Sequence, residues 1–269
     1  MDIFSIMKNN PLILNIDIFE KATKKKFPYY QYGKNNKLKL YARCPECGNP
    51  IQIINLYGAE MIQNETKIIK TYAKHTSNKI NGFTFWNETE KENCSLYKPT
   101  PLGNSIIKHN DAYSKELKEL IERNKRKIFK DIREIVSINL SNQILDGLYD
   151  SFLNTEAYTF KAVTMYNIPY AILYYQQSTS LYGQYILSSS LGKTIAKQIN
   201  ENSQFFKVEP DGKIVKETKE YKNIDYIFTK FKNNGTEKTV TLEIFESLDD
   251  NQTHTILCEK INLKSFVYS

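Results

Sequence analysis

Four side chains of this 269-residue chain have the types and the order of a metal site with sulfur and nitrogen ligands. Cys44 and Cys47 lie two residues apart in the stretch RCPECGNP, and His75 and Cys94 follow farther along the chain. Two thiolates at this spacing, in a turn closed by proline and glycine, can face one tetrahedral ion. The pattern C-x2-C-x27-H-x18-C therefore predicts a structural Zn2+ ion held by these four residues.

Other interpretations of the same residues stay open at the level of sequence. The close cysteines could be a reduced or a redox pair, but a redox pair of the thioredoxin type lies between a strand and a helix. Here strand-like runs stand on both sides, at 38–43 and 50–57, which favours a hairpin with a zinc turn at its tip. His75 could be an ordinary polar residue near a strand end, and Cys94 a small buried hydrophobic residue.

This part of the chain resembles the N-terminal zinc module of competence proteins of the CoiA type. The resemblance covers about residues 38–97 and rests on Tyr41-x-x-Cys44-Pro45-x-Cys47-x-x-Pro50-Ile51, Tyr72-Ala73-Lys74-His75 and Cys94. It implies a zinc-ribbon-like module. Tyr72 stands where that family has the first histidine of its signature, and the nuclease domain that follows the module in the family is not recognisable here. The resemblance therefore implies a metal module without the nuclease activity.

The length and the low number of cysteines limit the class of protein. A chain of 269 residues can hold one large or two modest domains with ample core. Four cysteines are too few for a disulfide scaffold, and the CPxC arrangement is typical of a reducing compartment. The N-terminus lacks the features of a signal peptide, and the longest apolar run, 168–175, is too short to cross a bilayer. We expect a cytoplasmic protein without a membrane segment.

Positive charge is concentrated near the N-terminus. The formal net charge is +7, and residues 1–43 alone hold nine Lys or Arg against three acids. Aromatic residues are interleaved with these cations: Phe27, Tyr29, Tyr30, Tyr32 and Tyr41. Cations for phosphates and aromatic faces for bases are combined in proteins that bind nucleic acid. The candidate nucleic-acid-binding residues are Lys24, Lys25, Lys26, Tyr29, Tyr30, Lys37, Lys39 and Arg43.

These basic and aromatic residues also have an ordinary structural interpretation. The three consecutive lysines could end a helix over 16–26, where cations suit the negative end of the helix dipole. The tyrosines could be core or edge-strand residues.

The remainder of the chain predicts helices followed by strands. Apolar residues at helical spacing between Leu117 and Ile135 predict one amphipathic helix from Asp111 onward. Ser141 is a candidate N-cap for a second helix, and Pro169 suits the first turn of a third. A fourth helix is predicted over about residues 186–200.

Strand-like runs follow residue 205, and the turn signals PDG at 210–212 and NNG at 233–235 predict antiparallel hairpins. The expected fold class is therefore α+β, with a zinc-ribbon-like hairpin module, a helical middle layer and a C-terminal antiparallel sheet. We expect two domains, 1–105 and 106–269.

Catalytic motifs are not recognisable in the sequence. GKT at 192–194 resembles the end of a phosphate-binding loop, but Leu187 stands at the position of the earlier glycine. A divalent-metal nuclease of the restriction type needs an acid on one strand and E-x-K on the next. Asp225 and Glu243 lie on neighbouring predicted strands, but Phe245 replaces the lysine. A nuclease with a degenerate motif is therefore only a third hypothesis.

The sequence favours a non-catalytic, zinc-stabilised protein whose partner is nucleic acid. The rival hypothesis is a protein-interaction adaptor in a larger bacterial assembly, such as anti-phage defence or DNA uptake machinery. Abundant tyrosine and several helical faces suit a partner protein equally well.

Overall fold

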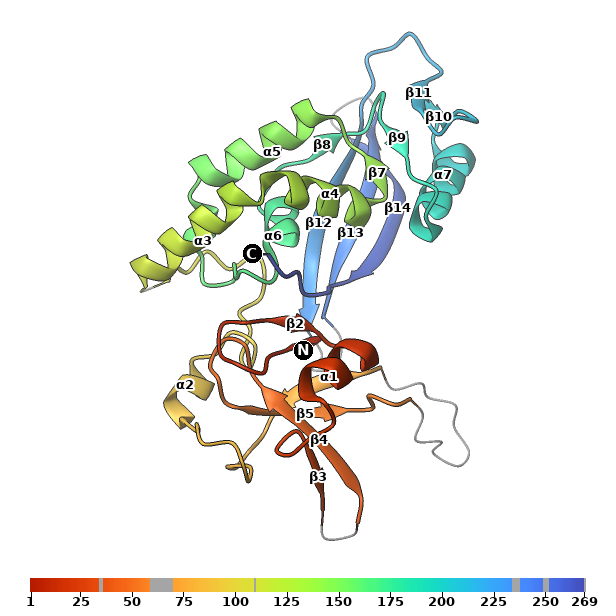
Figure 1. The fold of residues 1–269 in the computed structure, drawn as a ribbon. Helices are drawn as coiled ribbons and strands as arrows, with labels where there is room; N and C mark the ends of the chain where they lie inside the picture. Colours follow the sequence, from red (N-terminus) through yellow and green to blue (C-terminus); the bar gives the residue numbers. More distant parts are fainter. Residues whose placement is uncertain (34–35, 59–69, 109, 234–237, 249–251, 269) are drawn as a thin grey trace. The chain divides into compact units, whose positions relative to one another are not determined.

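The computed structural model describes residues 1–269 except 34–35, 59–69, 109, 234–237, 249–251 and 269. The chain forms two compact units, Met1–Thr100 (unit 1) and Pro101–Ser269 (unit 2) (Figure 1). The predicted α+β class is confirmed, because helices and antiparallel sheets occur together and the C-terminal strands form an antiparallel sheet. Within the described ranges, no helix combines the length and the apolar composition needed to span a bilayer.

Unit 1 is built on a four-stranded antiparallel sheet. Its strands, in spatial order, are β3 (Tyr30–Tyr32), β4 (Leu38–Arg43), β5 (Pro50–Ile54) and β6 (Tyr72–His75). The predicted hairpin is formed by β4 and β5, with Arg43 opposite Pro50. Because His75 pairs with Ile51, the pairing of β6 carries this histidine to the end of the sheet where the β4–β5 turn lies.

The sheet of unit 1 packs against an N-terminal hairpin and a helix. These are β1 (Ile3–Phe4), β2 (Leu12–Ile13) and α1 (Ile16–Thr23); a short helix, α2 (Glu88–Glu92), follows the sheet. The rings of Phe4 and Phe19 are fully buried, with centroids 5.1 Å apart. Helix α1 ends at Thr23, not at residue 26 as predicted, because Lys24 adopts a left-handed conformation with φ 52°.

Unit 2 contains a second four-stranded antiparallel sheet. Its spatial order is β14 (Thr253–Asn262), β13 (Lys238–Ser247), β12 (Ile224–Asn233) and β8 (Thr179–Ser180). Alternate residues of β12, namely Ile224, Tyr226 and Phe228, are buried, as expected for a sheet with one covered face. Two of the residues predicted to turn between β12 and β13, Asn234 and Gly235, lie outside the described residues.

Two short strand pairs extend unit 2. They are β7 (Ile138–Asn139) with β9 (Tyr185–Ile186), and β10 (Phe206–Val208) with β11 (Ile214–Lys216). The predicted PDG turn connects β10 to β11. Gly212 has φ +90° there, a conformation that glycine adopts without steric cost.

The helical layer of unit 2 contains one helix more than the sequence predicted. The helices are α3 (Asp111–Arg123), α4 (Lys125–Val136), α5 (Asn142–Asn154), α6 (Ile168–Tyr174) and α7 (Ser190–Asn202), with a 3-10 turn at Ala157–Thr159. The single helix predicted from Asp111 is two helices, because Asn124 interrupts it with φ −105° and ψ 13°. Both the backbone N–H and the side-chain amide of Asn124 donate to the carbonyl of Leu120, the competition by which asparagine disfavours helix interiors.

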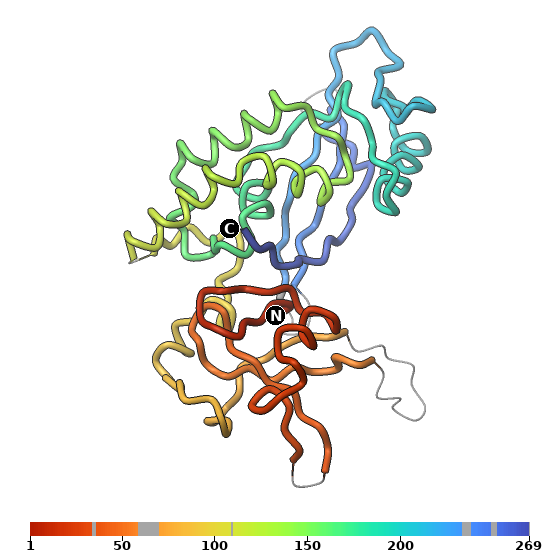
Figure 2. The backbone as a smooth tube through the Cα atoms, in the orientation of Figure 1, coloured from red at the N-terminus to blue at the C-terminus, as the bar shows by residue number. Residues whose placement is uncertain are grey.

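Two of the remaining helix starts follow the sequence signals, and the start of α7 does not. Ser141 caps α5 by accepting a hydrogen bond from the backbone N–H of Ile144, and Pro169 lies in the first turn of α6. Helix α7 begins after its cap Ser189, since Ile186 belongs to β9. Helix α4 packs on α6 and α6 on β12, so the helices α3 to α6 gather on one side of the sheet (Figures 1 and 2).

Candidate metal centre

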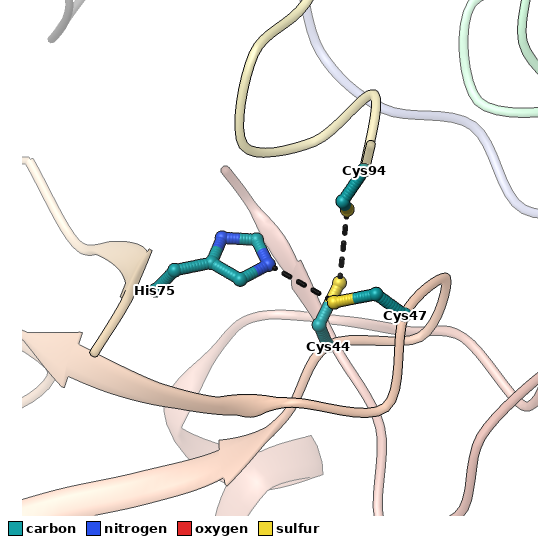
Figure 3. Close-up of side chains that lie close together, drawn as sticks. All are labelled: Cys44, Cys47, His75 and Cys94. Atoms are coloured by element: carbon teal, nitrogen blue, oxygen red, sulfur yellow. Dashed lines mark hydrogen bonds between the residues drawn. The ribbon is translucent and has the colours of Figure 1, made fainter. Parts of the chain in front are cut away.

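Four donor atoms from three segments of unit 1 meet at one point (Figure 3). The sulfur atoms of Cys44, Cys47 and Cys94 and a ring nitrogen of His75 all lie within 4.8 Å of one another. The sulfurs of Cys44 and Cys94 are 3.7 Å apart, and the sulfur of Cys47 lies 3.3 Å from Nε2 of His75. A tetrahedral ion with metal–sulfur bonds of about 2.3 Å separates its sulfur ligands by about 3.8 Å. The donor types and their spacing therefore fit a tetrahedral metal ion.

The turn between β4 and β5 presents the first two donors. We call residues 44–49 the cysteine turn. The N–H of Cys44 donates to the carbonyl of Asn49 (2.8 Å), and the N–H of Gly48 donates to the carbonyl of Cys44 (2.9 Å). Gly48 has φ +74°, so a side chain at this position would strain the turn. These short-range contacts bring the sulfurs of Cys44 and Cys47 together (Figure 3).

A pair of asparagines ties the cysteine turn to the segment that carries Cys94. The fully buried Asn49 donates from its side chain to the carbonyl of Asn87 (2.9 Å) and accepts from the N–H of Asn87 (2.8 Å). Asn87 also caps α2, since its side chain accepts from the N–H of Glu90. Cys94 follows the end of this short helix, so fixing Asn87 limits the positions that Cys94 can reach.

Glu46 binds the same segment at Ser95, the residue that follows Cys94. Its carboxylate accepts hydrogen bonds from the N–H of Ser95 (2.7 Å) and from the hydroxyl of Ser95 (2.6 Å). Burial raises the pKa of Glu46, and the two hydrogen bonds from Ser95 partly offset the rise. Glu46 occupies the variable position of the CPxC pattern, so the sequence carried no signal for this contact.

The three thiols are buried beside one another, and each changes the pKa of its neighbours. Cys44 is 0 % exposed and Cys47 and Cys94 are each 2 % exposed. Burial raises the pKa of the Cys44 thiol to about 12, whereas hydrogen bonds from Cys44 and Cys94 hold the pKa of Cys47 far below its usual range. Hydrogen bonds to the other two sulfurs also raise the pKa of Cys94. Three adjacent sulfurs thus favour a single thiolate, and a bound divalent cation would allow all three to ionise.

Aromatic residues pack around His75. Its ring meets that of Tyr97 edge-on with centroids 5.2 Å apart, and its buried Nδ1 has no hydrogen-bond partner within the part of the chain that the structure describes. The buried ammonium group of Lys91 lies 5.4 Å from the centre of Tyr97 and 5.0 Å from that of Trp86. It also pairs with Glu88 at 2.6 Å. These contacts position Tyr97 beside the histidine, and the sequence pattern did not reveal them.

The chemistry of the centre is that of a closed site. Four protein donors complete a tetrahedral shell, whereas catalytic zinc sites keep one position open for water or substrate. Among the residues that the structure describes, the Cys44, Cys47, His75 and Cys94 cluster is the one group of three or more such side chains that could share a metal ion.

Among the described residues of unit 2, no group of three or more His, Cys, Asp or Glu side chains could share a metal ion, so the nuclease hypothesis gains no support there. Asp225 pairs with Phe245 and Glu243 with Ile227, so the two acids are diagonal neighbours on one face of the β12–β13 ladder and not a directly opposed pair. The carboxylate of Glu243 accepts from the hydroxyl of Thr229 (2.7 Å) and from the ammonium of Lys230 (2.8 Å). Glu243 therefore has structural partners on β12.

The lysines proposed to contact nucleic acid have different environments. Lys24, Lys26, Lys37 and Lys39 are exposed. Lys25 pairs with Glu20 at 2.9 Å.

The other candidates are partly enclosed by protein. Arg43 is half-buried: its guanidinium group lies 5.3 Å from the centre of the Phe83 ring and donates to the carbonyl of Gly48. Tyr29 and Tyr30 are also half-buried. The ring of Tyr29 meets Phe83, and that of Tyr30 meets Phe19.

Replacing Glu46 by alanine is expected to weaken metal binding about 10- to 100-fold, the usual effect of losing a group that orients a metal ligand. The change removes both acceptors for Ser95 and so frees the backbone next to Cys94. Competition with a chromophoric chelator measures the affinity. Glu90→Ala is the matched control, because Glu90 is a half-exposed acid on α2 whose ion pair with Lys8 is long, at 3.7 Å. Equal affinities for the two variants would contradict the role assigned to Glu46.

Comparisons of this chain with known protein families, proteins and structures identified no relative. The chain matches no protein-family model, no curated protein and no solved structure. The likeness of residues 38–97 to the CoiA-type zinc module therefore stays a prediction. A function can be inferred only from the residues and contacts of the chain itself.

Proposed function

We propose that the chain is a zinc-stabilised protein that binds nucleic acid and that its metal ion is structural. The observation that carries the metal assignment is the Cys3His cluster, whose three cysteines are buried and whose four donors all lie within 4.8 Å of one another. Thiolate and imidazole donors in a tetrahedral arrangement suit zinc, whereas magnesium and calcium prefer oxygen. Four protein ligands would leave no coordination position open, which supports a structural role for the ion.

The distribution of charge supports nucleic acid as the partner. Residues 21–45 contain eight Lys or Arg and not a single Asp or Glu. The metal centre anchors one end of this basic segment, since Cys44 follows β4 directly. Of the exposed lysines at 24, 26, 37 and 39, Lys39 lies on β4 itself, and the others lie in the segments that lead into β3 and β4.

Replacing Lys24, Lys26 and Lys39 together by serine is expected to weaken the salt dependence of binding. Each phosphate contact to a single strand contributes about 0.7 to the slope of log affinity against log salt concentration, so three lost contacts lower the slope by about 2. Fluorescence anisotropy with a labelled oligodeoxythymidine at several salt concentrations measures the slope.

A triple variant of exposed unit 2 lysines is the control for this experiment. Lys115, Lys193 and Lys260 are exposed, and their replacement by serine changes the net charge equally. An equal change of slope in both triple variants would contradict the proposed surface. Wild-type binding to both single strands and duplex weaker than about 100 μM at low salt would overturn the proposed function, because ordinary non-specific binding is at least that strong.

Exposed tyrosines favour a protein adaptor as the second candidate function. Tyr221 is 90 % exposed and Tyr182 is 55 % exposed, both in unit 2, and tyrosine is enriched in protein–protein interfaces. For either function we propose the cytoplasm as the compartment. Its support is chemical: the four cysteines are free thiols, and three of them are needed as metal ligands.

A further inference from the structure

The exposed aromatic rings of the basic segment are not the pair that the sequence singled out. Phe27 is 59 % exposed and Tyr32 is 70 % exposed, whereas Tyr29 and Tyr30 are half-buried. The hydroxyl of Tyr30 also lies 2.7 Å from that of Tyr57. A half-buried ring offers less of its face to a base than an exposed one. Phe27 and Tyr32 lie at the two ends of residues 27–32, the stretch that leads into and through β3. Their exposed rings are accessible to a base.

The ring of Phe27 packs against the backbone of Gly82. A Cβ atom added to Gly82 would come within 2.5 Å of the Phe27 ring and of the Pro28 side chain, so the ring rests directly on the Gly82 backbone. The side-chain amide of Gln31 donates to the carbonyls of Pro28 (2.7 Å) and Asn81 (2.9 Å), which ties these two loops together. The exposed ring is therefore held in place before any ligand binds.

Tyr32 is positioned by the β3–β4 ladder, in a hairpin that also carries exposed lysines. It pairs with Leu38, which lies between the exposed lysines 37 and 39. The N–H of Gly33 donates to the carbonyl of Lys37 at 2.9 Å, so the ladder extends past the end of β3. An aromatic face and ammonium groups thus share the end of one hairpin.

We propose that Phe27 and Tyr32 stack on nucleobases and that the partner is single-stranded nucleic acid. This inference rests on the proposed function and narrows its partner. Aromatic side chains can stack on bases that are splayed out of a strand, but in a duplex the bases stack on each other and leave no free face. In this proposal, exposed lysines of the same basic segment contact the phosphates of the bound strand.

The test compares Phe27→Ala and Tyr32→Ala with the wild type. Anisotropy is measured with a labelled oligodeoxythymidine and with a labelled duplex, across a range of salt concentrations. Each alanine variant should weaken binding to the single strand by about 5-fold or more at every salt concentration, since one stacked base contributes about 1 to 3 kcal/mol. The slope against log salt should not change, because stacking releases no counterions. Binding to the duplex should be weaker than to the single strand in the wild type and unaffected by either change.

Three controls separate the outcomes. Tyr221→Ala removes a more exposed tyrosine from unit 2 and should leave single-strand binding unchanged. Phe27→Tyr and Tyr32→Phe keep the ring and should retain wild-type affinity, and equal metal content and melting temperature show that the alanine variants are folded. If the wild type binds the single strand and both alanine variants bind it equally well, the stacking inference is overturned while the proposed function stands. The same holds if the wild type binds the duplex more tightly than the single strand. Absence of binding to both probes overturns both.

Discussion

Replacing Cys44 by serine is expected to abolish metal binding and to unfold unit 1. Structural zinc contributes about 10 to 16 kcal/mol of apparent binding free energy in finger peptides, which equals or exceeds the whole stability of a typical domain, about 5 to 15 kcal/mol. The sulfur of Cys44 lies 3.7 Å from that of Cys94 and is one of the four donors within 4.8 Å of one another, so its loss leaves the shell incomplete. Native mass spectrometry measures the metal, and amide hydrogen exchange measures the loss of protection in residues 1–100.

Cys258→Ser is the matched control for this variant. Cys258 is an exposed free cysteine on β14 of unit 2, so its replacement changes the same atom type without touching the cluster. Unit 2 also serves as an internal reference, because its amides should keep their protection in both variants. A Cys44→Ser protein with one bound zinc ion and a protected unit 1 would refute the metal centre. Full zinc affinity in Cys94→Ser alone would remove only that ligand.

Replacing Glu246 by alanine is expected to destabilise unit 2 by about 3 kcal/mol. The fully buried carboxylate on β13 joins three segments. It accepts from the hydroxyl of Ser203 (2.6 Å) and the N–H of Gln204 (2.9 Å), and it lies 3.0 Å from Nδ1 of His254. Alanine removes the shared acceptor of these partly buried groups, at a cost of about 1 to 3 kcal/mol for each group that water cannot fully reach.

Thermal unfolding of the full chain measures this effect. A loss of about 3 kcal/mol should lower the Tm of unit 2 by about 6 to 12 °C for a domain of this size. Glu243→Ala on the same strand is the control: Glu243 is paired with the exposed Lys230, and its replacement should cost less than about 1 kcal/mol. A Tm shift that is no larger for Glu246→Ala than for Glu243→Ala would show that the buried contacts do not stabilise unit 2.

Features encoded over a few residues could be read directly from the sequence. The hairpin that carries Cys44 and Cys47 is confirmed because strand alternation and a Pro–Gly turn are local properties. Ser141 and Pro169 mark helix starts for the same reason, since capping and the fixed φ of proline act within one turn. The residue types and order of the four metal ligands were also sufficient to nominate them as a set.

Only the tertiary structure decided what surrounds those ligands. The contacts between Glu46 and Ser95 and between Asn49 and Asn87 join residues far apart in the chain, and no periodicity records such pairs. The same is true of exposure: Tyr30 and Tyr32 are two residues apart on one strand, yet Phe19 covers the first ring and the second is 70 % exposed. Sequence thus determined which groups could bind a metal or a base, whereas long-range packing determined which of them are brought together and which are left facing water.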